Sequence, residues 1–112
     1  MEKRMIRLAR GAKCGPDKQP IYGWHEETAY CEGGLAVHKA MKGHRWQWMV
    51  THEASGLSLE VIGAMTKARA VENMRAALAL PFDWTRGEAE TIAALRESRG
   101  IVDAMRRIGE SA

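Results

Sequence analysis

The 112-residue sequence contains only two cysteines, three prolines and one phenylalanine, and it has no long hydrophobic run. A membrane-spanning helix needs about 20 apolar residues in succession, so none is expected. The basic N-terminus, Met1 to Arg10, is not followed by the short apolar segment of a secretory signal. We therefore expect a cytoplasmic protein with no membrane partner, in which Cys14 and Cys31 are free thiols.

The sequence also lacks the short motifs that mark common enzyme classes. It has no P-loop, no nucleophile elbow and no dinucleotide-binding glycine pattern, and His52-Glu53 does not continue into the zinc-protease motif. The nearest approach to a nucleophilic cluster is the group His25, Glu26, Glu27 and Cys31. A cysteine nucleophile also needs an oxyanion site, and no pattern indicates one. The sequence predicts a protein that is not an enzyme and needs no cofactor.

Four potential zinc ligands lie in the first third of the chain, at Cys14, His25, Cys31 and His38. Ten, five and six residues separate them in turn. Pairs of ligands in a zinc knuckle are normally two to four residues apart, so that one turn presents both of them. We therefore predict no metal site, with two reduced thiols and two surface histidines as the simpler interpretation.

Positive charge is concentrated at the start of the chain, although the formal net charge is only +3. Residues 1–13 contain five basic side chains, Lys3, Arg4, Arg7, Arg10 and Lys13, against Glu2 alone. The other 99 residues hold 12 basic and 13 acidic groups, a net charge of −1. Such a segment attracts phosphates or an acidic protein surface, and the alternative is an ordinary solubilising terminus.

The N-terminal half of the chain favours strands, and residues 1–112 are expected to form one domain. Residues 1–13 are a basic N-terminal arm or an edge strand, and glycines and prolines make residues 14–34 an irregular loop region. Alternation over residues 35–62 predicts a three-stranded meander with turns at 42–45 and 54–56. Its apolar face carries Leu35, Val37, Trp46, Trp48, Val50, Leu57, Leu59 and Val61. The opposite face, with His38, Gln47, Thr51, Ser58 and Glu60, is expected to be wetter.

Two helices are expected after the meander. The first covers 66–80, with Thr66 as N-cap and Pro81 as its stop. The second covers 86–108 behind a capping box formed by Thr85 and Glu88. Gly100 weakens this segment, which we predict to be continuous or kinked rather than two helices. The fold class is α+β: a three-stranded antiparallel sheet, four-stranded if residues 1–13 join it, followed by two helices packed on one face.

Nucleic-acid or nucleoprotein binding through basic side chains is the leading functional hypothesis. The residues expected to make the contacts are Lys3, Arg4, Arg7, Arg10, Lys13, Lys39, Lys42, His44, Arg45, Arg99 and Arg106. Trp46 and Trp48 are assigned to the core rather than to base stacking. The order of strand, turn, strand and helix from Trp48 to Ala70 is loosely similar to the three-stranded-sheet DNA-binding domains of phage integrases. That similarity covers about a quarter of the chain and transfers no residue role.

The alternative hypothesis is a small inhibitor or adaptor that docks on a host protein complex. Small proteins with a basic arm and no enzyme motif are common in phages and plasmids, which is an analogy of class only. Helix 86–108 would supply a basic face through Arg96, Arg99, Arg106 and Arg107, unless that face is only solvated. Met49 is a candidate contact residue, and a sheet edge or the Ile101–Ile108 stripe would allow a homodimer.

Overall fold

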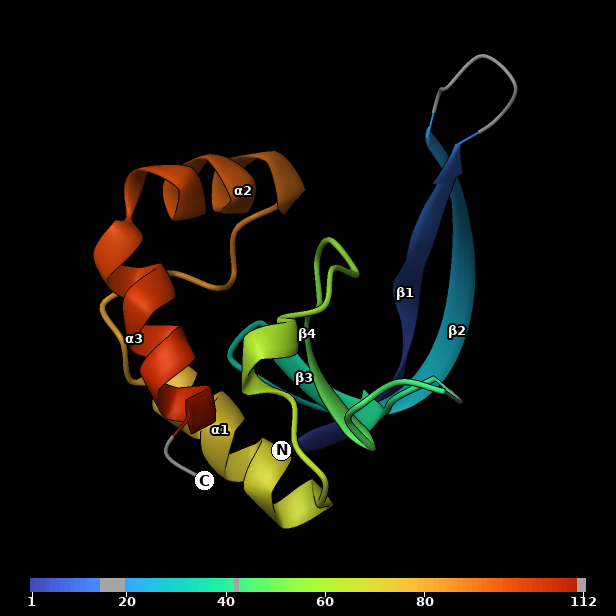
Figure 1. Ribbon diagram of the computed structural model, residues 1–112, viewed down its shortest axis with the longest axis horizontal. Coiled ribbons are helices and arrows are strands. Elements are labelled where there is room, and N and C mark those ends of the chain that lie inside the picture. Colours follow the sequence, from blue (N-terminus) through green and yellow to red (C-terminus); the bar gives the residue numbers. More distant parts are fainter. Residues whose placement is uncertain (15–19, 42, 111–112) are drawn as a thin grey trace.

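An antiparallel sheet of four strands leads into three helices, which confirms the predicted α+β class (Figure 1). The computed structural model describes residues 1–14, 20–41 and 43–110, with the backbone alone described at 9–14 and 20–24. The elements are β1 (Glu2–Cys14), β2 (Pro20–Glu32), β3 (Leu35–Lys39), β4 (Trp48–His52), the 3₁₀ helix η1 (Glu60–Ile62), α1 (Lys67–Leu78), α2 (Glu88–Glu97) and α3 (Arg99–Glu110). None of these helices is both long and apolar enough to cross a bilayer.

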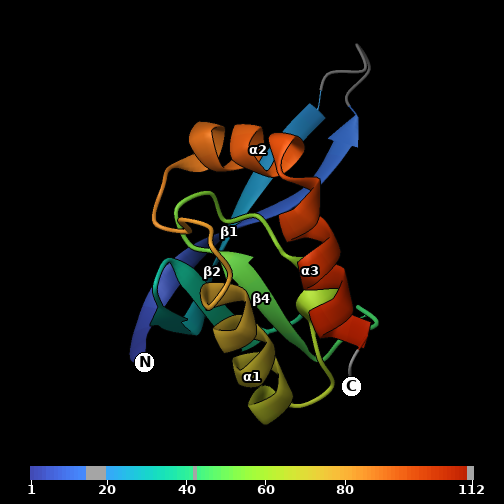
Figure 2. The same cartoon turned by 90° about the vertical axis from the view of Figure 1, so that its left-hand side faces the viewer.

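The first two strands form a long ribbon, and this corrects the irregular loop predicted for residues 14–34. β1 and β2 each have 13 residues and pair from Glu2 opposite Cys31 to Cys14 opposite Pro20. Pro20 is tolerated because it stands at the first position of its strand. The edge strand expected in residues 1–13 is confirmed, since β1 lies at one end of the strand order. We call β1 and β2 together the ribbon, and its far end extends beyond the rest of the molecule in Figures 1 and 2.

The base of the ribbon is held to the body by a tight turn and two polar contacts. Gly33 and Gly34 connect β2 to β3 with φ of 59° and 96°, the two positive values that a type I′ hairpin turn requires. From α1, the Lys67 ammonium lies 3.5 Å from the centre of the Tyr30 ring, and Arg75 lies 3.3 Å from Glu32. The body therefore fixes the direction in which the ribbon leaves it.

The sheet is buried on both faces at β3 and β4, which corrects the wetter face predicted from alternation. One face carries Leu35, Val37 and Val50 against α1, with no exposed surface. On the other face a second cluster joins the three strands β1, β2 and β3 through Ile6, Leu8, Ala29, Cys31 and Ala36. His38, Met49 and Thr51 are buried as a result, so Met49 is not a surface contact residue.

The helical half confirms one predicted helix and corrects the other. Thr66 caps α1, because its hydroxyl accepts a hydrogen bond from the Arg69 amide at 3.2 Å. The segment predicted as one helix over 86–108 is two helices, which meet at Ser98 rather than at Gly100. The predicted capping box is also wrong, since Gly87 is the N-cap of α2 and the Thr85 hydroxyl bonds to Asp83 instead. The third strand of the meander, 57–61, reduces to one bridge at Ser58 followed by η1.

A buried histidine ties β4 to the segment between α1 and α2. His52 Nε2 lies 3.0 Å from the carbonyl oxygens of both Trp84 and Arg86, and Nδ1 lies 2.7 Å from the Ser55 hydroxyl. Carbonyl oxygens only accept, so Nε2 donates to them. Both ring nitrogens have hydrogen-bond partners, which explains how a polar ring lies in this interior.

Candidate nucleic-acid interface

The basic residues of β1 divide between two faces of the ribbon. Alternation puts Arg4 on the inward face with Ile6 and Leu8, which are buried, while Lys3 and Arg7 lie on the opposite face and are exposed. Across the ladder, Lys3 faces Tyr30 and Arg7 faces Glu26. The five cations predicted as one arm are thus not equivalent, and each must be judged by its neighbours.

Arg4 acts as a structural ion-pair partner. Its guanidinium lies 2.6 Å from the Glu53 carboxylate and 3.0 Å from that of Glu2. The hydrogen bond that Arg4 donates to Glu53 raises the pKa of Arg4 above its ordinary value. Glu53 directly follows β4, so this contact joins the first strand of the sheet to the end of the last one. Arg4 is therefore a weaker candidate for phosphate contact than its position in the sequence predicted.

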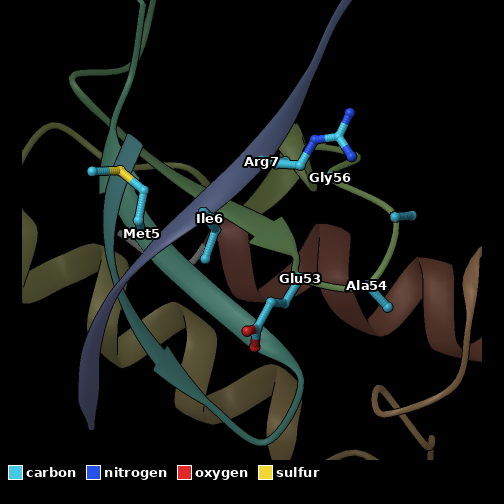
Figure 3. A pocket seen from close by; sticks show the side chains of 7 residues that line it. Met5, Ile6, Arg7, Glu53, Ala54 and Gly56 are labelled. Atoms are coloured by element: carbon cyan, nitrogen blue, oxygen red, sulfur yellow. The ribbon is translucent and has the colours of Figure 1, made fainter. Parts of the chain in front are cut away.

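A pocket of about 260 Å³ lies where β1 meets the turn after β4. Figure 3 shows Met5, Ile6 and Arg7 on one side and the Glu53–Gly56 turn on the other, with the Arg7 side chain extending toward Gly56. Glu53 brings a carboxylate to this pocket and Arg7 a guanidinium, so the charges of its wall are mixed. We assign the pocket to the junction between ribbon and body rather than to an anion site.

Charge changes sign along the ribbon. The half next to the body, residues 1–8 and 25–32, holds three basic and four acidic side chains and has a net charge of −1. The acidic members are Glu2, Glu26, Glu27 and Glu32. The remaining stretch of sequence, 9–24, holds Arg10, Lys13 and Lys18 against Asp17, a net charge of +2. Lys18 and Asp17 lie outside the described residues, whereas the backbone of Arg10 and Lys13 is part of β1. The positive excess therefore belongs to the far half of the ribbon.

The basic residues between β3 and β4 form a separate group. Lys39 is exposed at the end of β3, and Lys42 lies outside the described residues. His44 Nε2 lies 3.2 Å from Glu60, and the Arg45 guanidinium carbon lies 4.8 Å from the centre of the Trp46 ring. The core assignment holds for Trp48, which packs against the main cluster, whereas Trp46 is half-buried at the surface.

The α3 residues form a third group. Arg99 is exposed in the first turn of α3, and Arg106 is exposed 3.8 Å from Asp103 on the same helix. The structure thus distributes the predicted contact residues over the ribbon, the β3–β4 connection and α3, and does not gather them on one strip.

Comparisons with known proteins add no assignment. No family model, no curated protein and no solved structure matches the chain. The argument for function therefore rests on the residues and their arrangement.

The potential zinc ligands that the structure describes are engaged elsewhere. Cys31 is buried in the second cluster, His25 lies 3.0 Å from Glu27, and His38 is bonded at both ring nitrogens. The Cys14 side chain lies outside the described residues. Within the described part of the chain, no three His, Cys, Asp or Glu side chains lie close enough together to hold a metal ion.

His38 makes the stability of the fold depend on pH. Its Nδ1 donates to the Lys39 carbonyl at 2.8 Å and its Nε2 accepts from the Thr51 hydroxyl at 2.7 Å, so the buried ring is neutral. Burial lowers the pKa of His38 below the ordinary value of 6.5, and the bond to the Lys39 carbonyl opposes this only in part. Below pH 6.5, His38 binds a proton more readily in the unfolded chain than in the folded protein, so protonation favours unfolding.

We expect the free energy of unfolding to fall as the pH drops below about 6.5, by at most about 1.4 kcal/mol per pH unit from this residue. Urea denaturation between pH 7.5 and 5 measures the slope. His38→Gln should flatten it, whereas His44→Gln, at a partly exposed histidine, should leave it closer to the wild-type slope. An unchanged slope in His38→Gln would show that other groups control the acid response.

Proposed function

We propose that the protein is a non-enzymatic binding module that contacts nucleic acid or a nucleoprotein through the far half of the β1–β2 ribbon. The observation that carries this proposal is the distribution of charge along the ribbon. Carboxylates accumulate beside the body, and the basic excess falls in residues 9–24, of which the described parts, 9–14 and 20–24, belong to the half of the ribbon that extends away from the body. A cation held away from carboxylates keeps more of its attraction for phosphate.

The shape of the ribbon supports the same function. A two-stranded antiparallel ribbon fits the major groove of a DNA duplex, in which strands of other proteins read base edges. The contacts of Lys67, Arg75 and Arg4 hold the base of this ribbon in one orientation. Lysine and arginine on the ribbon would supply phosphate contacts, which position a protein on its nucleic acid without selecting a sequence.

Salt dependence of binding tests this proposal. A fluorescent DNA duplex of about 30 base pairs, and an RNA duplex of the same sequence, are titrated with the protein at two salt concentrations. Three phosphate contacts should weaken DNA binding about 40-fold between 50 and 200 mM salt, because bound counterions are released. Failure to bind either duplex at the lower concentration would remove the proposal.

Two double variants that change the net charge by the same amount test which part of the protein contacts the nucleic acid. Arg10→Glu with Lys13→Glu should reduce the slope of log affinity against log salt by about two, because two phosphate contacts are lost. Arg99→Glu with Arg106→Glu changes the total charge equally but lies on α3, so the slope should stay near that of the wild type. If only the α3 pair lowers the slope, the ribbon is not the contact surface.

A further inference from the structure

Exposed apolar side chains gather around Trp46, on the opposite side of β4 from the second cluster. Met41 is 51% exposed, Met65 is 53% exposed and Val61 is 38% exposed. A pocket of about 220 Å³ is lined by Trp46, Gly63, Met65, Arg69, Asn73 and Gly109, and a shallower depression with Met41 and His44 shares Trp46. We call Met41, Trp46 and Met65 the Trp46 patch.

The backbone of Val61 lies against the end of α3. A Cβ built on Gly109 would collide with the Val61 carbonyl, so the end of α3 and the start of η1 meet beside the pocket. Gly109 thus allows α3 to form one wall of the pocket. Large apolar side chains scattered singly over a surface are ordinary, but a group around one pocket is typical of an interaction site.

Trp46 is held in one orientation before any partner binds. Its indole nitrogen donates to the Glu60 carbonyl at 2.9 Å, and its backbone amide donates to His44 Nδ1 at 3.1 Å. Gly63 packs so closely that a Cβ there would lie 2.5 Å from Cδ1 of the indole and 2.8 Å from Cγ. A fixed aromatic ring loses little conformational entropy on binding, which is the property of interface residues that contribute most to affinity.

The charge around the patch selects an acidic partner. Residues 33–52, which supply Met41 and Trp46, contain Lys39, Lys42 and Arg45 and no acidic residue. Arg69 lines the pocket on the α1 side. Two of the carboxylates nearby are already paired, Glu60 with His44 at 3.2 Å and Glu72 with Arg69 at 3.4 Å. A segment with carboxylates beside an apolar side chain would therefore complement both the rim and the pocket.

The same contacts argue against a nucleobase as the occupant. The Arg45 guanidinium already lies over the Trp46 ring at 4.8 Å, and Gly63 packs against its pyrrole atoms. A base could stack there only by displacing the guanidinium. The pocket itself is lined mainly by apolar atoms, and its volume equals that of about seven water molecules, which is room for one bulky apolar side chain.

We propose that the Trp46 patch binds an acidic segment of a partner protein, which inserts one large apolar side chain into the pocket between Trp46 and Met65. This surface is separate from the ribbon, so the protein would be able to hold a protein partner and a nucleic acid at the same time. Methionines suit the role because their flexible side chains adjust to the inserted group.

Selection from a displayed library of random peptides about twelve residues long tests the proposal on the full chain. We expect enrichment of peptides in which aspartate or glutamate flanks leucine, phenylalanine, tryptophan or methionine. A synthetic peptide with the enriched sequence is then titrated by fluorescence anisotropy. Met65→Glu and Met41→Glu should each weaken its binding about 10-fold or more. Met5→Glu, at an equally exposed methionine on β1, should change it less than about 2-fold.

Four outcomes would overturn the proposal. They are selection of no peptide family, selection of basic peptides, equal effects of Met65→Glu and Met5→Glu, and displacement of the peptide by a single-stranded oligonucleotide. A dimer that Met65→Glu converts to monomer would make a second copy of the chain the occupant instead. Thermal unfolding of each variant confirms that it is folded, and Arg10→Glu with Lys13→Glu must leave peptide affinity unchanged, which separates this surface from the ribbon.

Discussion

Replacing Trp84 with alanine is expected to lower the free energy of unfolding by about 3–5 kcal/mol, the usual cost of removing a large buried aromatic side chain. Trp84 is only 2% exposed, and its ring centre lies 4.5 Å from that of Phe82. Its indole nitrogen donates to the Ala77 carbonyl at 3.0 Å, near the end of α1. Its own carbonyl accepts from His52. One residue therefore joins α1, β4 and the segment that leads into α2.

Urea denaturation of the variant measures the loss. Trp84→Phe serves as the matched control, because it keeps most of the apolar area and removes the hydrogen bond to Ala77. It should cost about 1–3 kcal/mol, the penalty for leaving a buried carbonyl without its donor together with a small change in volume. A loss below about 1 kcal/mol in Trp84→Ala would contradict the packing described for this part of the core.

Reversing the three basic charges of residues 9–24 is expected to abolish most nucleic-acid affinity. The variant combines Arg10→Glu, Lys13→Glu and Lys18→Glu, and leaves Arg4 in place because its ion pair with Glu53 supports the fold. Each lost phosphate contact removes close to one decade of affinity at about 0.1 M salt, so the three together should cost on the order of 100-fold or more. Anisotropy titration of the labelled duplex measures this loss.

The control for this variant carries the same change of charge on the helices. Arg96→Glu, Arg99→Glu and Arg106→Glu lie on α2 and α3, and together they should weaken binding by less than about 5-fold through the change in net charge alone. Equal losses in both variants would mean that the total charge, rather than the ribbon, drives association. Unchanged far-ultraviolet circular dichroism shows that both variants are folded.

Local sequence signals predicted the elements whose structure depends on local contacts. Alternation located β3 and β4, and Thr66 with Pro81 bounded α1 closely. The basic edge strand followed from alternation of Ile6 and Leu8 with Arg7. β2 was missed because its glycines and Pro20 resemble a loop, although Tyr22, Trp24, Glu26, Thr28 and Tyr30 fall on alternate positions. Only pairing with β1 along its whole length makes this segment a strand.

The features that depend on distant residues could not be predicted from sequence patterns. Thr51 and His38 look like solvent-facing residues in the sequence, but both are buried because the sheet is covered on both faces at β3 and β4. The partner of Arg4 is Glu53, 49 residues away, so the sequence could not distinguish a structural arginine from one available to phosphate. The same holds for His44 and Glu60. The basic segment was predicted, but the position of Arg10 and Lys13 on the half of the ribbon away from the body required the fold.

Backbone NMR of the labelled protein, titrated with a short DNA duplex at low salt, is the most direct test of the claim that the ribbon contacts nucleic acid. The account predicts that the largest amide shifts fall in β1 and β2 between residues 7 and 26, with little change in α2 and α3. Shifts confined to α3 or to the Trp46 patch, or no shifts when the duplex exceeds the protein in concentration, would contradict it.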